Sequence, residues 1–201
     1  MQKRVTQHLS ANDDTLAQVI AEIDWPEITS TNNIFHDLLS CIIEQQIHYR
    51  STKKTFARLL AKAFLDELTL DNFEEFEERA LGDVKLSLKK YETLEGILEF
   101  FNRHSPDWPR MNDTEVRETL GSLSGIGHWT IDMILLYTLE RPNIFPAQDY
   151  HLRLVMEQLY GIGTKRITVE MKKVAESWSP YRSFGVKYLL AWKEMNKQQK
   201  L

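Results

Sequence analysis

Two features of this chain are the best candidates for binding and catalysis: a short glycine turn, and a carboxylate about twenty residues after it. Gly125-Ile126-Gly127 joins two helical patterns, and Asp149 ends the proline-bearing loop 144–149. Two glycines around one apolar residue allow a sharp turn and expose backbone N–H groups beside a helix N-terminus, which suits a phosphate. A phosphate-binding turn with a lone carboxylate suggests an enzyme that acts on nucleic acid.

The composition excludes several classes of protein. The chain has 201 residues, of which 42% are hydrophobic, enough for a substantial core. No apolar run reaches the roughly 18–20 residues that cross a bilayer, and the basic N-terminal stretch lacks the apolar region of a secretory signal. Cys41 is the only cysteine, which excludes an intrachain disulfide, a four-cysteine zinc site and an all-cysteine iron–sulfur cluster. A cytoplasmic protein is expected.

Charge is unevenly distributed along the chain. The net charge is −4, but residues 161–201 carry nine Lys/Arg against three Glu, so this segment is +6 and residues 1–160 are −10. A basic C-terminal quarter can hold a DNA backbone while the acidic stretch 66–83 faces away. Ordinary solvated helix faces are the alternative interpretation.

The elements that would position these residues are predicted to be helices. No alternating strand pattern occurs, and a polar stretch at 105–111 suggests a seam between two helical lobes. Asn112 or Asp113 is the expected cap of the helix that leads into the glycine turn. Apolar residues recur at helical spacing in segments 16–23, 34–43, 56–63, 73–76, 91–101, 116–123, 129–139, 150–160, 168–178 and 182–195.

Four stretches resemble those of one family, in the family's order. Residues 120–130, around the glycine turn, resemble the hairpin of the helix-hairpin-helix DNA glycosylase superfamily, and 144–149 resembles its catalytic-aspartate loop. Residues 42–46 and 178–183 resemble the Gln-Gln helix end and the Trp-x-Pro-Trp/Tyr-Arg-Ser segment of the 3-methyladenine DNA glycosylase branch. The resemblance implies an all-α fold in a single domain, 1–201. Two helical lobes would flank a DNA-binding cleft, with the hairpin at about 114–139 and without the N-terminal β lobe of longer members.

The resemblance assigns catalysis to Asp149. A target nucleotide leaves the base stack before its glycosidic bond breaks, and bond breaking develops oxocarbenium-like charge on the sugar. A preorganised carboxylate stabilises that charge and can orient a water. An N-alkylated purine is already cationic and leaves as a neutral base, so one carboxylate can suffice. The alternative is that Asp149 only caps the helix 150–160.

The resemblance also gives the hairpin a role in holding DNA. Backbone N–H groups would bind phosphates without reading sequence. The carbonyls of Leu123 and Gly125 would hold a structural Na⁺ or K⁺. A plain helix connection is the alternative. The expected phosphate-binding residues are Gly125, Ile126, Gly127, His128 and Thr130.

Three further residues would handle the flipped base. Trp129 occupies the position where strand-cutting members carry a Schiff-base lysine, so no lyase activity is expected. Its indole can stack on an electron-poor base, a cation–π contact of about 1–2 kcal/mol. Gln46 would fill the gap left in the duplex, and Gln45 would line the base pocket. Core packing of Trp129 and a solvated helix end for the two glutamines are the alternatives.

Three positions depart from the family pattern and leave the substrate range open. Glu44 stands where a small residue usually precedes the two glutamines, and would place a negative charge near the DNA surface. Lys85 replaces an expected glycine, and Leu190 replaces a tryptophan often found in the last helix. Asp132, inside the apolar segment after the turn, could partner a buried cation or a backbone amide.

Together these features predict a monofunctional N-glycosylase of base excision repair. Its substrates would be alkylated purines in damaged double-stranded DNA, chiefly 3-methyladenine, with 7-methylguanine as a second candidate. The protein would be a monomer without required cofactors or membrane partners, located in a bacterial cytoplasm at the nucleoid or in a eukaryotic nucleus. The alternatives are a glycosylase for uracil, hypoxanthine or a mismatched base, and a non-catalytic DNA-structure-binding protein.

Overall fold

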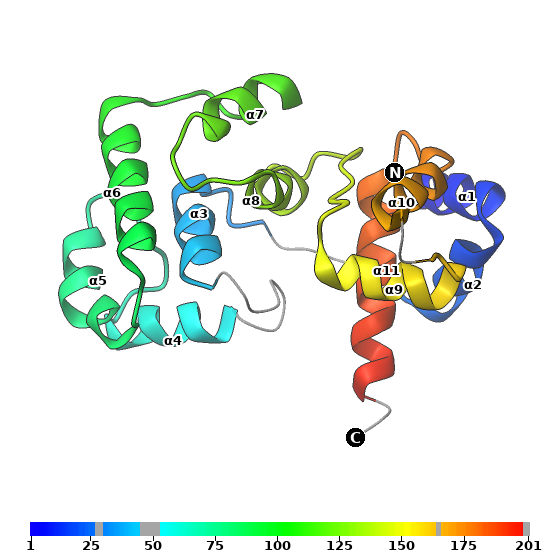
Figure 1. The fold of residues 1–201 in the computed structure, drawn as a ribbon, viewed down its shortest axis with the longest axis horizontal. Coiled ribbons are helices and arrows are strands. Elements are labelled where there is room, and N and C mark those ends of the chain that lie inside the picture. Colours follow the sequence, from blue (N-terminus) through cyan, green and yellow to red (C-terminus); the bar gives the residue numbers. More distant parts are fainter. Residues whose placement is uncertain (27–29, 45–52, 164–165, 199–201) are drawn as a thin grey trace. The chain divides into compact units, whose positions relative to one another are not determined.

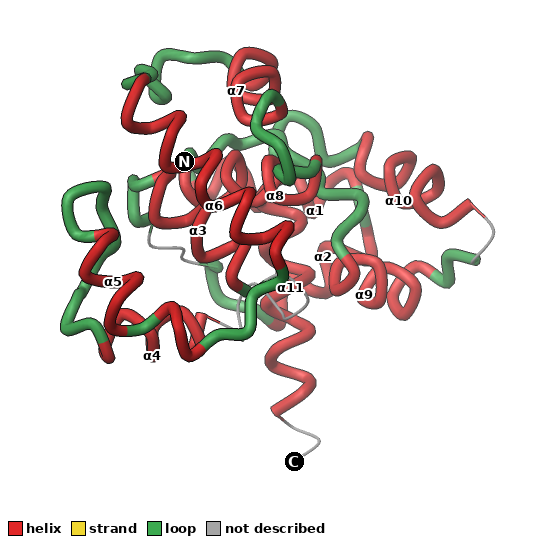
Figure 2. Tube along the Cα trace, turned by 60° about the vertical axis from the view of Figure 1, so that its left-hand side comes forward, coloured by secondary structure: helices red, strands yellow, loops and turns green. Residues whose placement is uncertain are grey.

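The chain folds into helices joined by loops. The computed structural model describes residues 1–26, 30–44, 53–163 and 166–198, and none of these is in a strand (Figures 1 and 2). The all-α prediction is confirmed for this part of the chain. Within it, no helix is both long and apolar enough to span a bilayer. Two compact units are present: Met1–Thr29 with Glu140–Leu201, and Ser30–Leu139.

The division between units does not fall at the predicted seam. Residues 105–111 lie inside the second unit, between α6 (Leu88–Arg103) and α7 (Asp113–Gly121). The reason is aromatic packing: the Trp108 ring lies 6.1 Å from Phe101 and 6.4 Å from Phe100, centroid to centroid, so α6 anchors this polar stretch.

The first unit combines two segments that are far apart in the sequence, Met1–Thr29 and Glu140–Leu201. Helix α11 packs against α2 and α9, and α10 packs against α9 and α11. Its helices are α1 (Gln2–Asn12), α2 (Asp14–Glu22), α9 (Tyr150–Tyr160), α10 (Ile167–Glu176) and α11 (Arg182–Gln198).

One carboxylate joins three parts of the first unit. Asp13 caps α2, since its Oδ1 accepts the Leu16 N–H at 2.8 Å. Its Oδ2 accepts Trp178 Nε1 at 2.7 Å and the Tyr160 hydroxyl at 2.9 Å. Trp178 is fully buried. Burial, and then the adjacent Asp13 charge, raises the pKa of Tyr160, which therefore stays a hydrogen-bond donor.

The second unit surrounds one apolar helix. All ten residues of α3 (Ile34–Ile43) are buried, and α3 packs against α4 (Lys53–Lys62), α6 and the π-helix η2 (Ile134–Thr138). Helix α5 (Phe73–Arg79) and the short η1 (Leu81–Asp83) complete this unit, together with α7 and α8 (His128–Met133). Phe35, Phe56, Phe73 and Phe76 form an aromatic cluster in this core, with edge-to-face contacts in the Phe35–Phe73 and Phe56–Phe76 pairs.

A buried carboxylate ties α3 to the end of η2. Asp37 Oδ2 accepts the hydroxyls of Thr31 and Thr138, each at 2.7 Å. The Ser30 hydroxyl donates to the Thr138 carbonyl at 2.6 Å. Because η2 continues α8, these bonds also fix the helix that follows the glycine turn.

Candidate functional site

The predicted site residues belong to different parts of the molecule. The glycine turn and Trp129 lie in the second unit, and Asp149 lies in the first. Gln45 and Gln46 lie outside the described residues.

Two helices with well-defined ends frame the turn. Helix α7 begins with a capping box: the Asn112 side chain accepts the N–H groups of Thr114 (2.9 Å) and Glu115 (3.0 Å), and Glu115 Oε2 accepts the Asn112 N–H at 2.7 Å. The prediction of a cap at Asn112 or Asp113 is confirmed at Asn112. Helix α8 starts directly after the turn, with Gly127 as its N-cap residue.

The two glycines of the turn differ in whether the structure requires a glycine at that position. Gly125 has φ 86°, the left-handed region, and a Cβ there would lie 2.0 Å from Thr93 Oγ1 of α6. Gly127 has φ −94° and ψ 167°, which any residue can adopt, and a Cβ at this position would have no neighbouring atom within 4 Å. The fold therefore requires glycine at Gly125 but not at Gly127, where the missing side chain leaves open space before α8.

Alanine substitutions should separate these two roles. We expect Gly125→Ala to lower the free energy of unfolding by about 2–4 kcal/mol, because a left-handed residue and an overpacked contact with Thr93 are both costly. Gly127→Ala should change it by less than about 1 kcal/mol. Urea denaturation of both variants measures the difference. Equal destabilisation would contradict this account of the turn.

The side chains that flank the turn differ in exposure. His128 is exposed and Trp129 is half-buried, whereas Thr130 is only 2% exposed. A phosphate contact from Thr130 would therefore have to use its backbone N–H. The Leu123 carbonyl accepts the Ile126 N–H at 3.2 Å, and a carbonyl keeps a second lone pair for a cation.

An ion pair that the sequence analysis missed locks the hairpin. Arg117 Nη2 of α7 lies 2.6 Å from Asp132 Oδ1 of α8, so a cation is among the partners of Asp132. The Asp132 side chain is 12% exposed and that of Arg117 is 38% exposed. A signal existed, because the two residues carry opposite charges and stand equally far from the middle of the connection 122–127.

Of the three departures from the family pattern, the structure explains the one at Glu44. Glu44 does not place a charge on a surface: it is 4% exposed, and its Oε1 accepts the Phe56 N–H in the first turn of α4 at 2.8 Å. The prediction for Glu44 was wrong because a carboxylate at a helix N-terminus satisfies otherwise unpaired N–H groups. Lys85 is exposed before α6, and Leu190 is half-buried on α11.

Asp149 is a nearly buried carboxylate held by backbone N–H groups. It is 6% exposed and is the N-cap residue of α9. Its Oδ1 accepts the N–H groups of His151 at 2.9 Å and Leu152 at 2.7 Å, and its own N–H donates to the Pro146 carbonyl at 2.9 Å. Capping therefore occurs, and it fixes the orientation of the carboxyl group, as a preorganised catalytic carboxylate requires.

The loop before Asp149 rests on the Trp178–Ser183 segment. The Ser183 hydroxyl accepts the Ile144 N–H at 2.8 Å and donates to the Arg141 carbonyl at 2.5 Å, and the Phe145 and Trp178 rings are 5.9 Å apart. Gly185 allows close packing there, since a Cβ would lie 2.7 Å from Trp178 Cε3. Two of the four matched stretches are thus brought together in the first unit.

Some of the basic residues of the C-terminal quarter are not exposed. Lys187 is buried, with its Nζ 5.3 Å from the Phe184 ring centroid, and Lys193 is half-buried beside His151. Lys165 and Lys200 lie outside the described residues. The exposed basic residues of this segment, within the described part of the chain, are Arg166, Lys172, Lys173 and Lys197.

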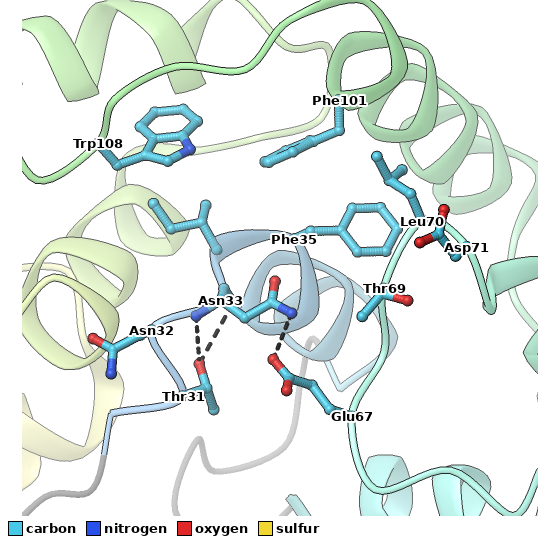
Figure 3. Close-up of a pocket in the computed structure, with 11 residues that line it drawn as sticks. Thr31, Asn32, Asn33, Phe35, Glu67, Thr69, Leu70, Asp71, Phe101 and Trp108 are labelled. Atoms are coloured by element: carbon cyan, nitrogen blue, oxygen red, sulfur yellow. Dashed lines mark hydrogen bonds between the residues drawn. The ribbon is translucent and has the colours of Figure 1, made fainter.

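A pocket in the second unit has no link to the predicted site. It lies at the start of α3, and its polar side chains bond to one another: Asn33 Nδ2 donates to Glu67 Oε1 at 2.6 Å (Figure 3). Its lining includes Thr31, Asn32, Asn33, Phe35, Glu67, Asp71, Phe101 and Trp108, and no predicted site residue. Among the described residues, no group of three or more His, Cys, Asp or Glu side chains could hold a metal ion.

Comparison with known proteins gives consistent matches in sequence and fold. Residues 39–180 match the family model described as "HhH-GPD superfamily base excision DNA repair protein". The alkylbase DNA glycosidase-like protein mag2 of Schizosaccharomyces pombe is 24% identical over 93% of this chain and 92% of its own length. DNA-3-methyladenine glycosylase 1 of the same yeast is 23% identical over 92% and 84%.

The fold is similar to that of a solved glycosylase. The Schizosaccharomyces pombe 3-methyladenine DNA glycosylase in complex with abasic DNA superimposes with a TM-score of 0.77, at 22% identity, over 96% of this chain and 97% of the other. The predicted helix-hairpin-helix glycosylase fold is confirmed.

Proposed function

This chain belongs to the HhH-GPD superfamily of base excision DNA repair proteins, and on that premise we propose that it hydrolyses the N-glycosidic bond of alkylated purines in DNA. 3-Methyladenine is the proposed main substrate, with 7-methylguanine as a second. Relatives named as alkylbase or 3-methyladenine glycosylases support this substrate class, and a related glycosylase solved with abasic DNA supports a DNA partner. The observation that carries the proposal is the Asp149 carboxylate, fixed by two backbone N–H groups in the matched segment.

In the proposed reaction Asp149 acts on the sugar of a flipped nucleotide. As the bond to the base breaks, the sugar gains positive charge, and the fixed carboxylate stabilises that charge without reorganising. The same carboxylate orients the water that adds to the anomeric carbon. The alkylated purine leaves with the bonding electron pair as a neutral base, so no second acid is required. The water loses a proton to the solvent as it adds, so the products are a free base, an abasic site and a proton.

The other predicted residues support binding in this proposal. Backbone N–H groups from Gly125 to Thr130 hold phosphates of the duplex, and the carbonyls of Leu123 and Gly125 hold a monovalent cation. Trp129 stacks on the cationic base, and no Schiff-base lysine stands at this position, so the enzyme is a hydrolase without lyase activity. In this proposal Gln45 lines the base pocket and Gln46 intercalates into the duplex. The enzyme is a monomer.

Identification of released bases tests the proposal directly. The protein is incubated with methylated duplex DNA, and the supernatant is analysed by mass spectrometry. We expect 3-methyladenine as the main product, with intact strands before any alkaline treatment. A parallel set of duplexes containing uracil, hypoxanthine or a mismatch tests whether the protein instead acts on one of these substrates. Binding to abasic-site duplexes without release of any base would instead identify a non-catalytic DNA-binding protein.

A further inference from the structure

A lysine on the last helix contacts the turn that carries the proposed catalytic carboxylate. Lys193 of α11 forms a hydrogen bond through its Nζ with His151 Nδ1, in the first turn of α9. The backbone N–H of His151 is one of the two backbone N–H groups that donate to Asp149 Oδ1. Lys193, His151 and Asp149 thus form a continuous connection within the first unit, from α11 to the carboxylate.

The chemistry of the two side chains fixes the direction of the Lys193–His151 bond. An ammonium group has only donors, so His151 Nδ1 accepts, and the proton of the neutral imidazole is then on Nε2. Partial burial lowers the pKa of Lys193, the charges of Glu194 and Asp149 oppose this lowering, and the charge of Lys197 adds to it.

We propose that Lys193 is a positioning residue for Asp149, acting by holding His151 in one tautomer. The proposal rests on the function proposed above. Because His151 supplies a backbone donor to Asp149, a fixed His151 ring restrains the first turn of α9 and with it the carboxyl group. A displacement of about 1 Å at a reacting group can cost about 100-fold in rate, so a restraint of this kind matters for catalysis.

Lys197 offers a matched control. It lies one helical turn further along α11, carries the same charge and is exposed. Lys193→Met and Lys197→Met therefore remove the same charge from the same helix, but only the first removes the bond to His151. Lys193→Arg keeps a cationic donor.

The experiment measures rate, affinity and the state of His151 in the full chain. Single-turnover release of base from methylated duplex DNA gives the rate, and a duplex with an abasic-site analogue gives the affinity. Nitrogen-15 NMR of the histidines at neutral pH gives the tautomer. We expect Lys193→Met to slow release about 10-fold or more, with no greater loss of affinity than Lys197→Met, and to mix the tautomers of His151. Lys193→Arg should recover part of the rate.

Two results would overturn the proposal. If both methionine variants lose affinity equally and neither loses rate at saturation, Lys193 is a DNA-backbone contact. If the His151 signals are unchanged in Lys193→Met, Lys193 does not hold the ring. The NMR comparison needs no substrate, so it decides the role of Lys193 even if the wild-type protein releases no base and the proposed function fails. Should Lys193→Met not fold, Lys193→Ala, which also removes the donor to His151, replaces it in every measurement.

Discussion

Asp149→Asn is expected to reduce base release from methylated DNA by about 100-fold or more, because it removes the charge that stabilises the developing cation. Helix α9 should remain intact, since asparagine caps helices as well as aspartate does and can accept the same two N–H bonds. The free energy of unfolding should change by less than about 1 kcal/mol. Single-turnover release and thermal denaturation measure the two effects.

Asp149→Ala separates catalysis from capping. It removes both the charge and the cap, so it should lose activity and also about 1 kcal/mol of stability. Affinity for an abasic-site duplex should persist in both variants. Base release by Asp149→Asn at the wild-type rate would leave Asp149 as a helix cap only and would remove the basis of the proposed mechanism.

Asp13→Ala is expected to destabilise the first unit strongly. It leaves the indole N–H of Trp178 and the hydroxyl of Tyr160 without their acceptor and removes the cap of α2. Loss of a shared acceptor for two largely buried donors should cost about 3–5 kcal/mol, or roughly 6–20 °C in Tm for a chain of this size. Calorimetry gives both values.

The neighbouring Asp14 provides the control for this prediction. It is exposed in the first turn of α2, so Asp14→Ala should cost less than about 1 kcal/mol. Tyr160→Phe removes one donor of the network, and its loss of stability should lie between those of Asp13→Ala and Asp14→Ala. If Asp13→Ala and Asp14→Ala have the same stability, Asp13 is not a central support of the first unit.

The sequence was sufficient for features that depend on local pattern. Apolar residues at helical spacing predicted α3 and α9, and short polar residues before a helix predicted caps such as Asn112. Gly125 was found because a left-handed turn between two helices needs glycine. Each of these signals lies within a few residues of the feature that it predicts.

Features that depend on contacts across the fold were missed or misread. Glu44 looked like a surface charge, because nothing near it in sequence shows that it accepts the Phe56 N–H twelve residues later. Lys193 looked like one more member of a basic segment, because only the packing of α11 on α9 brings it to His151. The stretch 105–111 looked like a boundary, because its polarity conceals the packing of Trp108 on α6.

The discontinuous first unit has a consequence for synthesis on the ribosome. Residues 30–139 form a unit from one unbroken stretch, so they can fold as soon as they leave the exit tunnel. Helix α2 must wait, because its partner α11 is translated more than 150 residues later. Until α11 has been made, the nascent chain lacks the helix against which α2 packs in the folded unit. Asp149 reaches its final environment only when α11 has been made, because Ser183 of α11 holds the loop before it.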